Sequence, residues 1–375
     1  MKKKYGIVSY NIHGNYTNYG SVLQSYALQR AIELYMNEYI EPVIIDYYPD
    51  ALGESNPLEP LKNARSVSHE FKQMIELSMP AIRTNYNKVQ DFIRKHYIIS
   101  KKSYDAKNFN DSYIDENLSG YIVGSDAVWM IDFFGRDTGF WAGYESMKNS
   151  HTISYAVSCG ESNYSKDDLN FIREAIKNFK AIGVREQKYM DFFEECALCK
   201  VQRVVDPTLL IPVDLYSEIQ TDRFIHEPYI LLYSRKYDPE MEKYTDQIAE
   251  RYGCKVVEIS LRAQNRNKHI MQYSAGVEEF LSLIRYSENV ITNSLHATIF
   301  SILYHRPVSF FSRENAGNKV KELLDHYDLR RMVVEKDMIP QIIDDYDFDL
   351  VDQKIEKNRL CSIDFLQKSL ITSQA

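Results

Sequence analysis

The chain has 375 residues, long enough for two domains, and 44% of them are hydrophobic and 26% charged, a balance typical of globular proteins. Its formal net charge of −8 argues against nucleic acid as a partner. The five cysteines are odd in number and scattered, which excludes a disulfide framework and favours a reducing cytosol. We therefore expect a cytoplasmic protein.

The N-terminus has the positive charges of a signal peptide but lacks the apolar stretch that must follow them. No window of the sequence approaches the roughly 18–20 apolar residues that a membrane helix needs. We expect no membrane span and at most peripheral contact with a membrane.

Short apolar strands and amphipathic helices alternate along the first half of the chain. Between the first two strands, apolar residues from Val22 to Leu34 recur at helical spacing, and this order indicates a βαβ unit with a parallel sheet. The charged segment 51–99 reads instead as a helical insertion. The strands predicted in this half are Tyr5–Tyr10, Val43–Tyr47, Tyr121–Val123, Thr152–Val157, Ile182–Val184 and Val201–Val205.

Two proline-containing dipeptides, Asp206-Pro207 and Ile211-Pro212, interrupt this pattern, and a second series of elements follows Pro228. The sequence predicts an α/β fold of two Rossmann-like lobes, 1–212 and 213–349, which face each other across a cleft, and a closing helix in 350–375. The elements predicted in the second series are strands Tyr229–Ser234, Lys255–Ser260, Asn289–Asn293, Pro307–Phe311 and Met332–Glu335, and helices Pro239–Tyr252 and Val277–Tyr286.

Polar residues gather where these strands end, which is where a doubly wound sheet binds its ligands. The first cluster contains Asn18, Tyr19 and Gly20 at a helix start, whose free N–H groups suit an anion or a sugar hydroxyl. The alternative is simple helix capping by Asn18 or Ser21.

The second cluster follows the strand Tyr121–Val123. Asp126 either caps the next turn or faces the cleft, where it could orient or deprotonate a sugar hydroxyl. Ser125 lies beside it. Trp129 either stacks on a sugar ring or belongs to the core.

Arg185 ends a strand of apolar residues, an unusual place for a solvated charge. Its fork of donors suits a carboxylate or a phosphate. The alternative is a surface ion pair with Glu186 or Asp191.

The sharpest cluster is Asn293-Ser294-Leu295-His296, in which Asn293 or Ser294 can cap a helix and His296 lies in its first turn. Because the N–H groups there are unpaired and the helix dipole is positive, His296 is a candidate for phosphate contact or proton transfer. Arg313 and Lys319 follow the strand Pro307–Phe311 and either complete an anion site or belong to a solvated loop.

No metal site is predicted, because the acidic run at 344–349 has no strand-end setting and no histidine near it. The sequence contains no Walker A loop, no GxGxxG and no GxSxG.

Taken in order, these segments resemble the polysaccharide pyruvyl transferase family. The resemblance implies a GT-B-like pair of Rossmann-type lobes. It also implies transfer of a pyruvyl group from phosphoenolpyruvate to two hydroxyls of a sugar, which makes a ketal and releases phosphate without a further cofactor. The segments that carry it are Asn18–Gly20, Leu23–Gln29, Val123–Trp129, Ser154–Ser158, Val184–Glu186 and Ser294–Ser301.

Roles follow from the resemblance for the matching positions. Arg185 would bind the donor's phosphate or carboxylate, His296 would hold the phosphate or protonate the enol carbon, and Asp126 would face the acceptor. The donor site expected in full is Arg185, Arg235, Asn293, Ser294, His296, Arg313 and Lys319, and the expected acceptor site is Asn18, Tyr19, Gly20, Ser125, Asp126 and Trp129.

One position departs from the family's pattern, which places an arginine two residues before the histidine where this chain has Ser294. Arg313, Lys319 or Arg235 could supply the missing guanidinium or ammonium. The acceptor is expected to be a sugar or glycan, free or lipid-linked. The alternatives are a glycosyltransferase that uses a nucleotide sugar and a non-catalytic glycan-assembly binding protein.

Overall fold

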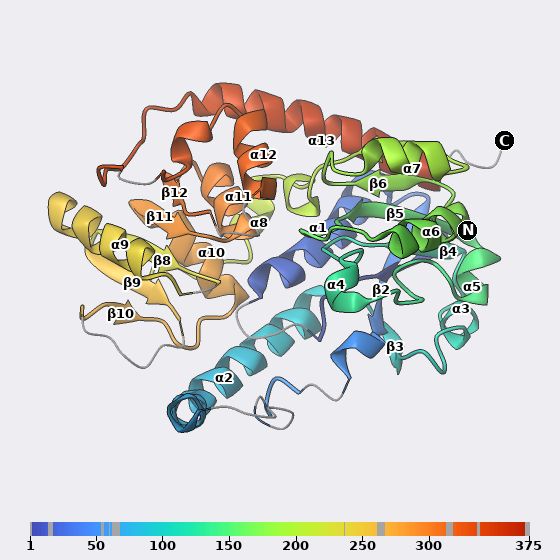
Figure 1. Ribbon diagram of the computed structural model, residues 1–375, viewed down its shortest axis with the longest axis horizontal. Coiled ribbons are helices and arrows are strands. Elements are labelled where there is room, and N and C mark those ends of the chain that lie inside the picture. The colour runs from blue at the N-terminus through green and yellow to red at the C-terminus, as the bar shows by residue number, and fades with distance from the viewer. Residues whose placement is uncertain are drawn as a thin grey trace.

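The computed structural model describes residues 2–13, 18–53, 56–59, 61, 68–235, 237–260, 267–312, 318–335 and 338–371. Two parallel sheets with helices packed around them form two lobes that lie side by side (Figure 1). The predicted α/β architecture is therefore confirmed. Among the described residues, no helix combines the length and the apolar character needed to cross a membrane.

The first lobe contains a seven-stranded sheet in the order β3-β2-β1-β4-β5-β6-β7. All of its strand pairs are parallel. The chain moves outward from β1 on one side and then returns to build the other side from β4, so the connections reverse between β1 and β4. Its strands are β1 (Lys3–Val8), β2 (Ile40–Tyr47), β3 (Ile99–Tyr104), β4 (Gly120–Val123), β5 (His151–Val157), β6 (Ile182–Val184) and β7 (Val201–Arg203).

The second lobe repeats this topology in five parallel strands, ordered β10-β9-β8-β11-β12. The reversal here lies between β8 and β11. In such sheets the crevice for a ligand opens at the carboxyl ends of the two strands that flank the reversal. The strands are β8 (Tyr229–Tyr233), β9 (Lys255–Ile259), β10 (Ile270–Met271), β11 (Asn289–Thr292) and β12 (Val308–Phe310).

Thirteen α-helices cover the sheets within the described residues. They are α1 (Tyr19–Met36), α2 (His69–His96), α3 (Asp111–Asp115), α4 (Ile131–Phe134), α5 (Glu145–Lys148), α6 (Lys166–Ala175), α7 (Met190–Cys196), α8 (Val213–Ser217), α9 (Pro239–Tyr252), α10 (Val277–Arg285), α11 (Leu295–Leu303), α12 (Asn318–His326) and α13 (Phe348–Leu370). Short 3₁₀ turns occupy Asp50–Leu52, Ile176–Asn178, Pro207–Leu209 and Arg330–Met332.

Most predicted elements are present with their ends shifted by a few residues at most, and Ile182–Val184 and Pro239–Tyr252 match residue for residue. The strand predicted at Met332–Glu335 is wrong, since only Val333 pairs with Phe310, in an isolated bridge. Sequence reading also missed β3. That strand has three consecutive exposed residues and a nearly polar sequence, so it lacks the apolar alternation that identifies a strand.

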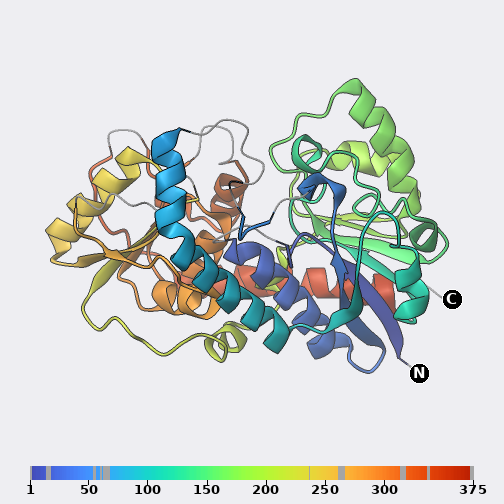
Figure 2. The same ribbon diagram turned by 90° about the horizontal axis from the view of Figure 1, so that it is seen from below.

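Helices from the first lobe tie it to the second. Tyr19 of α1 stacks on Phe280 of α10 with ring centroids 4.5 Å apart, and its hydroxyl donates to the carbonyl of Ala275 at 2.7 Å. α2 extends from the first lobe along the second (Figure 2), and its Lys88 forms an ion pair with Glu279 of α10. One continuous cluster of buried apolar side chains therefore spans both lobes.

α13 runs along both lobes (Figure 1). At its start, Asp352 pairs with His305 of the second lobe at 3.0 Å. Near its end, the hydroxyl of Ser362 accepts from the N–H of Val205, and His151 of the first lobe lies 2.8 Å from the carbonyl of Ser369. The predicted closing helix thus joins the two sheets from outside.

A buried carboxylate in the first lobe gives a prediction for stability against pH. Burial raises the pKa of Asp137 from 3.8 to about 6, although Tyr47 and two backbone N–H groups donate to its carboxylate. Because the pKa of Asp137 is higher in the folded state than in the unfolded state, its protonated form stabilises the fold fully at pH values below the unfolded-state pKa. This stabilisation is lost as the pH rises through the folded-state pKa.

We expect the stability difference between wild type and Asp137→Asn to change by about 2 kcal/mol between pH 4 and pH 6.5, with wild type losing stability. Urea unfolding of both proteins at several pH values measures this difference. A constant difference across that range would contradict the raised pKa.

Candidate active site

The reversal points of the two sheets face each other across a cleft of about 420 Å³. Residues from both lobes line it, and they include residues that follow the carboxyl ends of β1, β4, β6, β8 and β11. The lining side chains are Tyr10, Asn18, Gly20, Asp126, Ala127, Met130, Phe133, Phe134, Gly160, Glu161, Arg185, Tyr233, Arg235, Ser294, Leu295, His296, Lys319 and Val320.

Three helices begin at this cleft. Asn18 and Gly20 lie at the start of α1, Leu295 and His296 at the start of α11, and Lys319 in the first turn of α12. The side chain of Asn18 makes no capping bond to α1 within the described residues, so capping does not account for it. Converging helix N-termini present unpaired N–H groups and positive dipole ends, which favour an anionic ligand.

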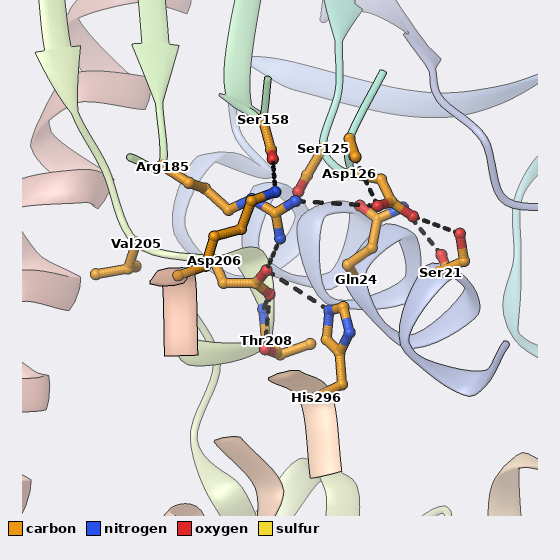
Figure 3. A network of polar contacts seen from close by, with 12 residues as sticks. Ser21, Gln24, Ser125, Asp126, Ser158, Arg185, Val205, Asp206, Thr208 and His296 are labelled. Atoms are coloured by element: carbon orange, nitrogen blue, oxygen red, sulfur yellow. Dashed lines mark hydrogen bonds and ion pairs between the residues drawn. The ribbon is translucent and has the colours of Figure 1, made fainter. Parts of the chain in front are cut away.

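A buried ion network joins the lobes at the base of the cleft (Figure 3). Asp206 pairs directly with Arg185, and its Oδ2 lies 3.6 Å from Nε2 of His296 in the second lobe. The side chains of Arg185 and Asp206 are only 9% and 5% exposed. Thr208 completes the site by donating its backbone N–H and its hydroxyl to Asp206 Oδ1 at 3.0 and 2.7 Å.

The carboxylate of Asp206 remains ionised despite its burial. Burial alone would raise its pKa, but Arg185 and then His296 and Thr208 outweigh burial and hold the pKa well below its usual range. Because this charge is fixed, Asp206 orients the imidazole of His296. His296 Nε2 is buried and faces Asp206, so Nδ1 is the ring nitrogen on the side away from this carboxylate.

Asp126 occupies the cleft side of the same network. Its Oδ1 lies 3.9 Å from Nη2 of Arg185, and its Oδ2 lies 2.5 Å from the hydroxyl of Ser21 on α1. Its backbone has φ = 84°, in the left-handed region that non-glycine residues rarely adopt. The preceding Gly124 is needed because a Cβ there would lie 2.3 Å from the carbonyl oxygen of Tyr155.

Lys319 forms a second link between the lobes. It reaches from α12 to Glu186 at 3.1 Å and also donates to the hydroxyl of Ser158. Burial would raise the pKa of Glu186, but Lys319 and Arg185 lower it overall, so this carboxylate is ionised as well. Much of the positive charge predicted for the donor site is therefore already paired with protein carboxylates.

Gly20 allows the two lobes to approach at the histidine. A Cβ at this position would lie 2.0 Å from Nδ1 of His296 and 2.3 Å from its Cγ. Only a glycine lets the imidazole rest directly against the first turn of α1. The start of α1 and His296 thus form one surface.

An aromatic wall, consisting of Tyr10, Phe133 and Phe134, borders the cleft on the first lobe. Ring centroids of Tyr10 and Phe134 lie 5.2 Å apart, and those of Phe133 and Phe134 4.7 Å. Phe133 is 46% exposed, a large apolar surface for a residue in a polar cleft. Such a ring suits the apolar face of a sugar.

Three residues predicted to contact the acceptor do not reach the cleft. Tyr19 is buried between the lobes, Ser125 lies below the cleft surface, and Trp129 stacks on Trp141 at 4.6 Å in the core. The indole N–H of Trp129 donates to the carbonyl of Phe140, so both its faces and its polar group are occupied by protein. All three side chains are buried, so in this structure they do not face the cleft.

The predicted donor residues have different environments. Ser294 caps α11 by accepting from the N–H of Ala297, and it also borders the cleft. Asn293 is buried and accepts from the N–H of Arg235, so it supports the loop that carries that arginine. Arg235 itself is exposed at the cleft. Arg313 lies outside the described residues.

Sequence reading missed Asp206 and the aromatic wall. Asp206 was interpreted with Pro207 as a break between lobes, although it follows β7 just as Arg185 follows β6. This position after a strand end was the signal in the sequence that could have identified Asp206 as a site residue. Phe133 gave no such signal, because an aromatic residue in a short helix is usually part of a core.

A family model for polysaccharide pyruvyl transferases matches residues 18–315 of the chain. The matched segment contains Asn18, Asp126, Arg185, Asp206 and His296, which are the polar groups at the base and mouth of the cleft. No curated protein matches the sequence significantly.

Several solved structures resemble this chain at low sequence identity. A protein described as a UDP-N-acetylglucosamine 2-epimerase from Listeria monocytogenes has a TM-score of 0.53 and 10% identity, with 100% of this chain and 91% of that chain covered. The UDP-GlcNAc 2-epimerase of Neisseria meningitidis bound to UDP-GlcNAc has a TM-score of 0.48 and 11% identity over the full length of both chains. At such identity the first likeness shows the fold alone, and it confirms the predicted GT-B-like arrangement.

The contact between Gly20 and His296 gives a prediction for stability. Replacing Gly20 by Ala would favour the helix by up to about 1 kcal/mol. The new methyl group overlaps the imidazole, however, so we expect a net loss of about 1–3 kcal/mol. Chemical unfolding measures the loss, and NMR of the histidine ring reports its displacement.

Leu34→Ala, at a 47% exposed position of the same helix, serves as the control and is expected to have a smaller effect. If Gly20→Ala were at least as stable as wild type with an unchanged His296 signal, the close packing of the lobes at this point would be refuted.

Proposed function

The chain belongs to the polysaccharide pyruvyl transferase family, and on this premise we propose that it moves a pyruvyl group from phosphoenolpyruvate onto two hydroxyls of a sugar. The sugar belongs to a surface polysaccharide or to its precursor. The family supports a transferase, and the residues of the cleft support the choice of donor. The proposal requires no cofactor and is compatible with a cytoplasmic location.

The chemistry needs one acid, one base and a site for anions. Protonation of the methylene carbon gives a methyl group and an oxocarbenium-like centre, which the first sugar hydroxyl attacks. The second hydroxyl then replaces phosphate, and the product is a ketal that retains the carboxylate. Of the two hydroxyl protons, one balances the proton delivered to carbon and the other leaves with phosphate.

His296 has the position of the acid. Its buried Nε2 faces Oδ2 of Asp206 at 3.6 Å, so the other ring nitrogen, Nδ1, would deliver the proton to a ligand in the cleft. An ionised carboxylate behind an imidazole holds it in one orientation and stabilises its charged form during proton transfer. The buried pair of His296 and Asp206 is the single observation on which the proposal chiefly rests.

Asp126 has the position of the base that accepts a hydroxyl proton. It lies on the first lobe, beside Asn18 and the aromatic wall that we assign to the acceptor. Because Ser21 and Arg185 hold its carboxylate on two sides, its geometry is fixed before an acceptor binds.

The donor has both a phosphate and a carboxylate, and the cleft offers two kinds of anion contact. Helix N-termini from both lobes supply N–H groups, and Arg235 supplies an exposed guanidinium next to Ser294. Arg235 borders the cleft together with Ser294, and we propose that it replaces the arginine that the family's pattern has at that position.

We expect the purified protein to release phosphate from phosphoenolpyruvate only when a sugar acceptor is present. His296→Asn should lower kcat by about 10²–10⁴-fold, because proton transfer by a positioned side chain contributes that much. A coupled phosphate assay with a panel of glycan acceptors measures the rate, and circular dichroism verifies folding.

His305→Asn is the matched control, because this exposed histidine lies just beyond the far end of α11. Equal rates for His296→Asn and wild type would refute the assignment of the acid. Thermal stabilisation by nucleotide sugars and not by phosphoenolpyruvate would instead favour glycosyl transfer.

A second test concerns the donor site. Arg235→Ala should weaken phosphoenolpyruvate binding by about tenfold to a hundredfold, the usual value of a lost charge-assisted hydrogen bond. Titration calorimetry measures the affinity, with the exposed Arg173→Ala of the first lobe as the control. Unchanged affinity would show that Arg235 does not replace the family's arginine.

A further inference from the structure

We propose that Glu242, Asp246 and His269, on the second lobe, bind one divalent transition-metal cation. None of the three lines the cleft, so the site is separate from the candidate active site. Glu242 and Asp246 belong to α9, and His269 immediately precedes β10. The proposal does not depend on the function proposed above.

The three side chains converge from two different elements. Glu242 and Asp246 are four residues apart on α9 and therefore project from the same face of the helix. One ligand atom from each of the two carboxylates and one ring nitrogen of His269 all lie within 4.8 Å of one another. A small adjustment brings them to the separations of about 3–3.5 Å that ligands at roughly 2.1 Å from one ion require.

A second carboxylate sets the orientation of the histidine. Glu258 of β9, whose side chain is 4% exposed, has its Oε2 2.7 Å from Nδ1 of His269. With the proton of the neutral ring on Nδ1, the lone pair of Nε2 points toward Asp246 Oδ1, 2.8 Å away. Two lone pairs repel at this distance, so a positive charge must lie between them, either a proton or a metal ion.

The arrangement matches that of protein metal sites. A ligating histidine normally donates its other N–H to a carboxylate, which is the relation of His269 to Glu258. A hydrogen bond also orients one of the carboxylate ligands, because the hydroxyl of Tyr237 donates to Glu242 at 2.6 Å. A set of one imidazole and two carboxylates suits Zn²⁺, Mn²⁺ or Fe²⁺ better than Ca²⁺ or Mg²⁺.

An ion can reach the site from solvent, and its binding there would have a structural consequence. Asp246 is 34% exposed, so an ion can enter from solvent, whereas His269 is 1% exposed and anchors the ion inside. The edge strand β10 contains only two residues paired with β9. A cation shared between α9 and His269 would fasten this short edge to the helix that covers it.

Metal analysis of untagged wild-type protein tests the proposal. After dialysis against EDTA, we expect calorimetry with Zn²⁺ or Mn²⁺ to give about one site per chain and thermal unfolding to shift upward on binding. Anomalous scattering at the zinc edge should place the ion between His269 and Asp246.

His269→Gln should abolish this binding. Because that variant alters a buried group, Asp246→Asn at the more exposed ligand provides an independent test, with circular dichroism to verify folding. Glu250→Gln, at an exposed position of the same helix, is the matched control and should bind like wild type.

Binding at this site by wild type and the control, and its loss in both ligand variants, would support the proposal. The absence of a stoichiometric site in wild type, or equal binding by a folded Asp246→Asn, would overturn it and leave a proton as the charge between His269 and Asp246.

Discussion

The ion pair between Arg185 and Asp206 determines the polar arrangement of the cleft. A buried carboxylate is costly to desolvate and persists only with good partners, and Asp206 has a guanidinium, an imidazole and the N–H and hydroxyl of Thr208. Arg185, held in this way, also approaches Asp126. The positions of His296, Asp126 and the charge that lies between them thus depend on one interaction.

The same pairing explains why the cleft is not strongly cationic. Arg185 and Lys319 both form ion pairs with ionised carboxylates, so these carboxylates largely neutralise their positive charges. Helix N-termini and the exposed Arg235 also contribute positive potential at the cleft. This differs from the sequence interpretation, in which Arg185 itself meets the donor.

The fold was largely predictable, because apolar strands and amphipathic helices can be recognised from the spacing of apolar residues in the sequence. The site was predictable only in part. Residues after strand ends, such as Asp126, Arg185 and His296, follow a positional rule of doubly wound sheets. Tyr19, Ser125 and Trp129 obey the same rule of position, yet the local chain turns their side chains into the core, and no pattern in the sequence reveals that turn.

Contacts between residues distant in the chain were not predictable at all. The approach of Gly20 to His296 and of Lys319 to Glu186 depends on how the two lobes dock. The same holds for His269 with Asp246 and Glu258, which are 23 and 11 residues away in the chain. Spacing along the chain contains no direct information about such pairs.

The position of α13 has a consequence for folding during synthesis. Both sheets precede residues 348–370 in the chain, yet Ile355, Phe365 and Leu366 of α13 are buried in the cluster that spans the lobes. Until that helix emerges and docks, the lobes expose the apolar surface that it later covers. The core that spans the lobes can therefore be completed only after residues 348–370 have been synthesised, and exposed apolar surface of this kind is prone to aggregation until then.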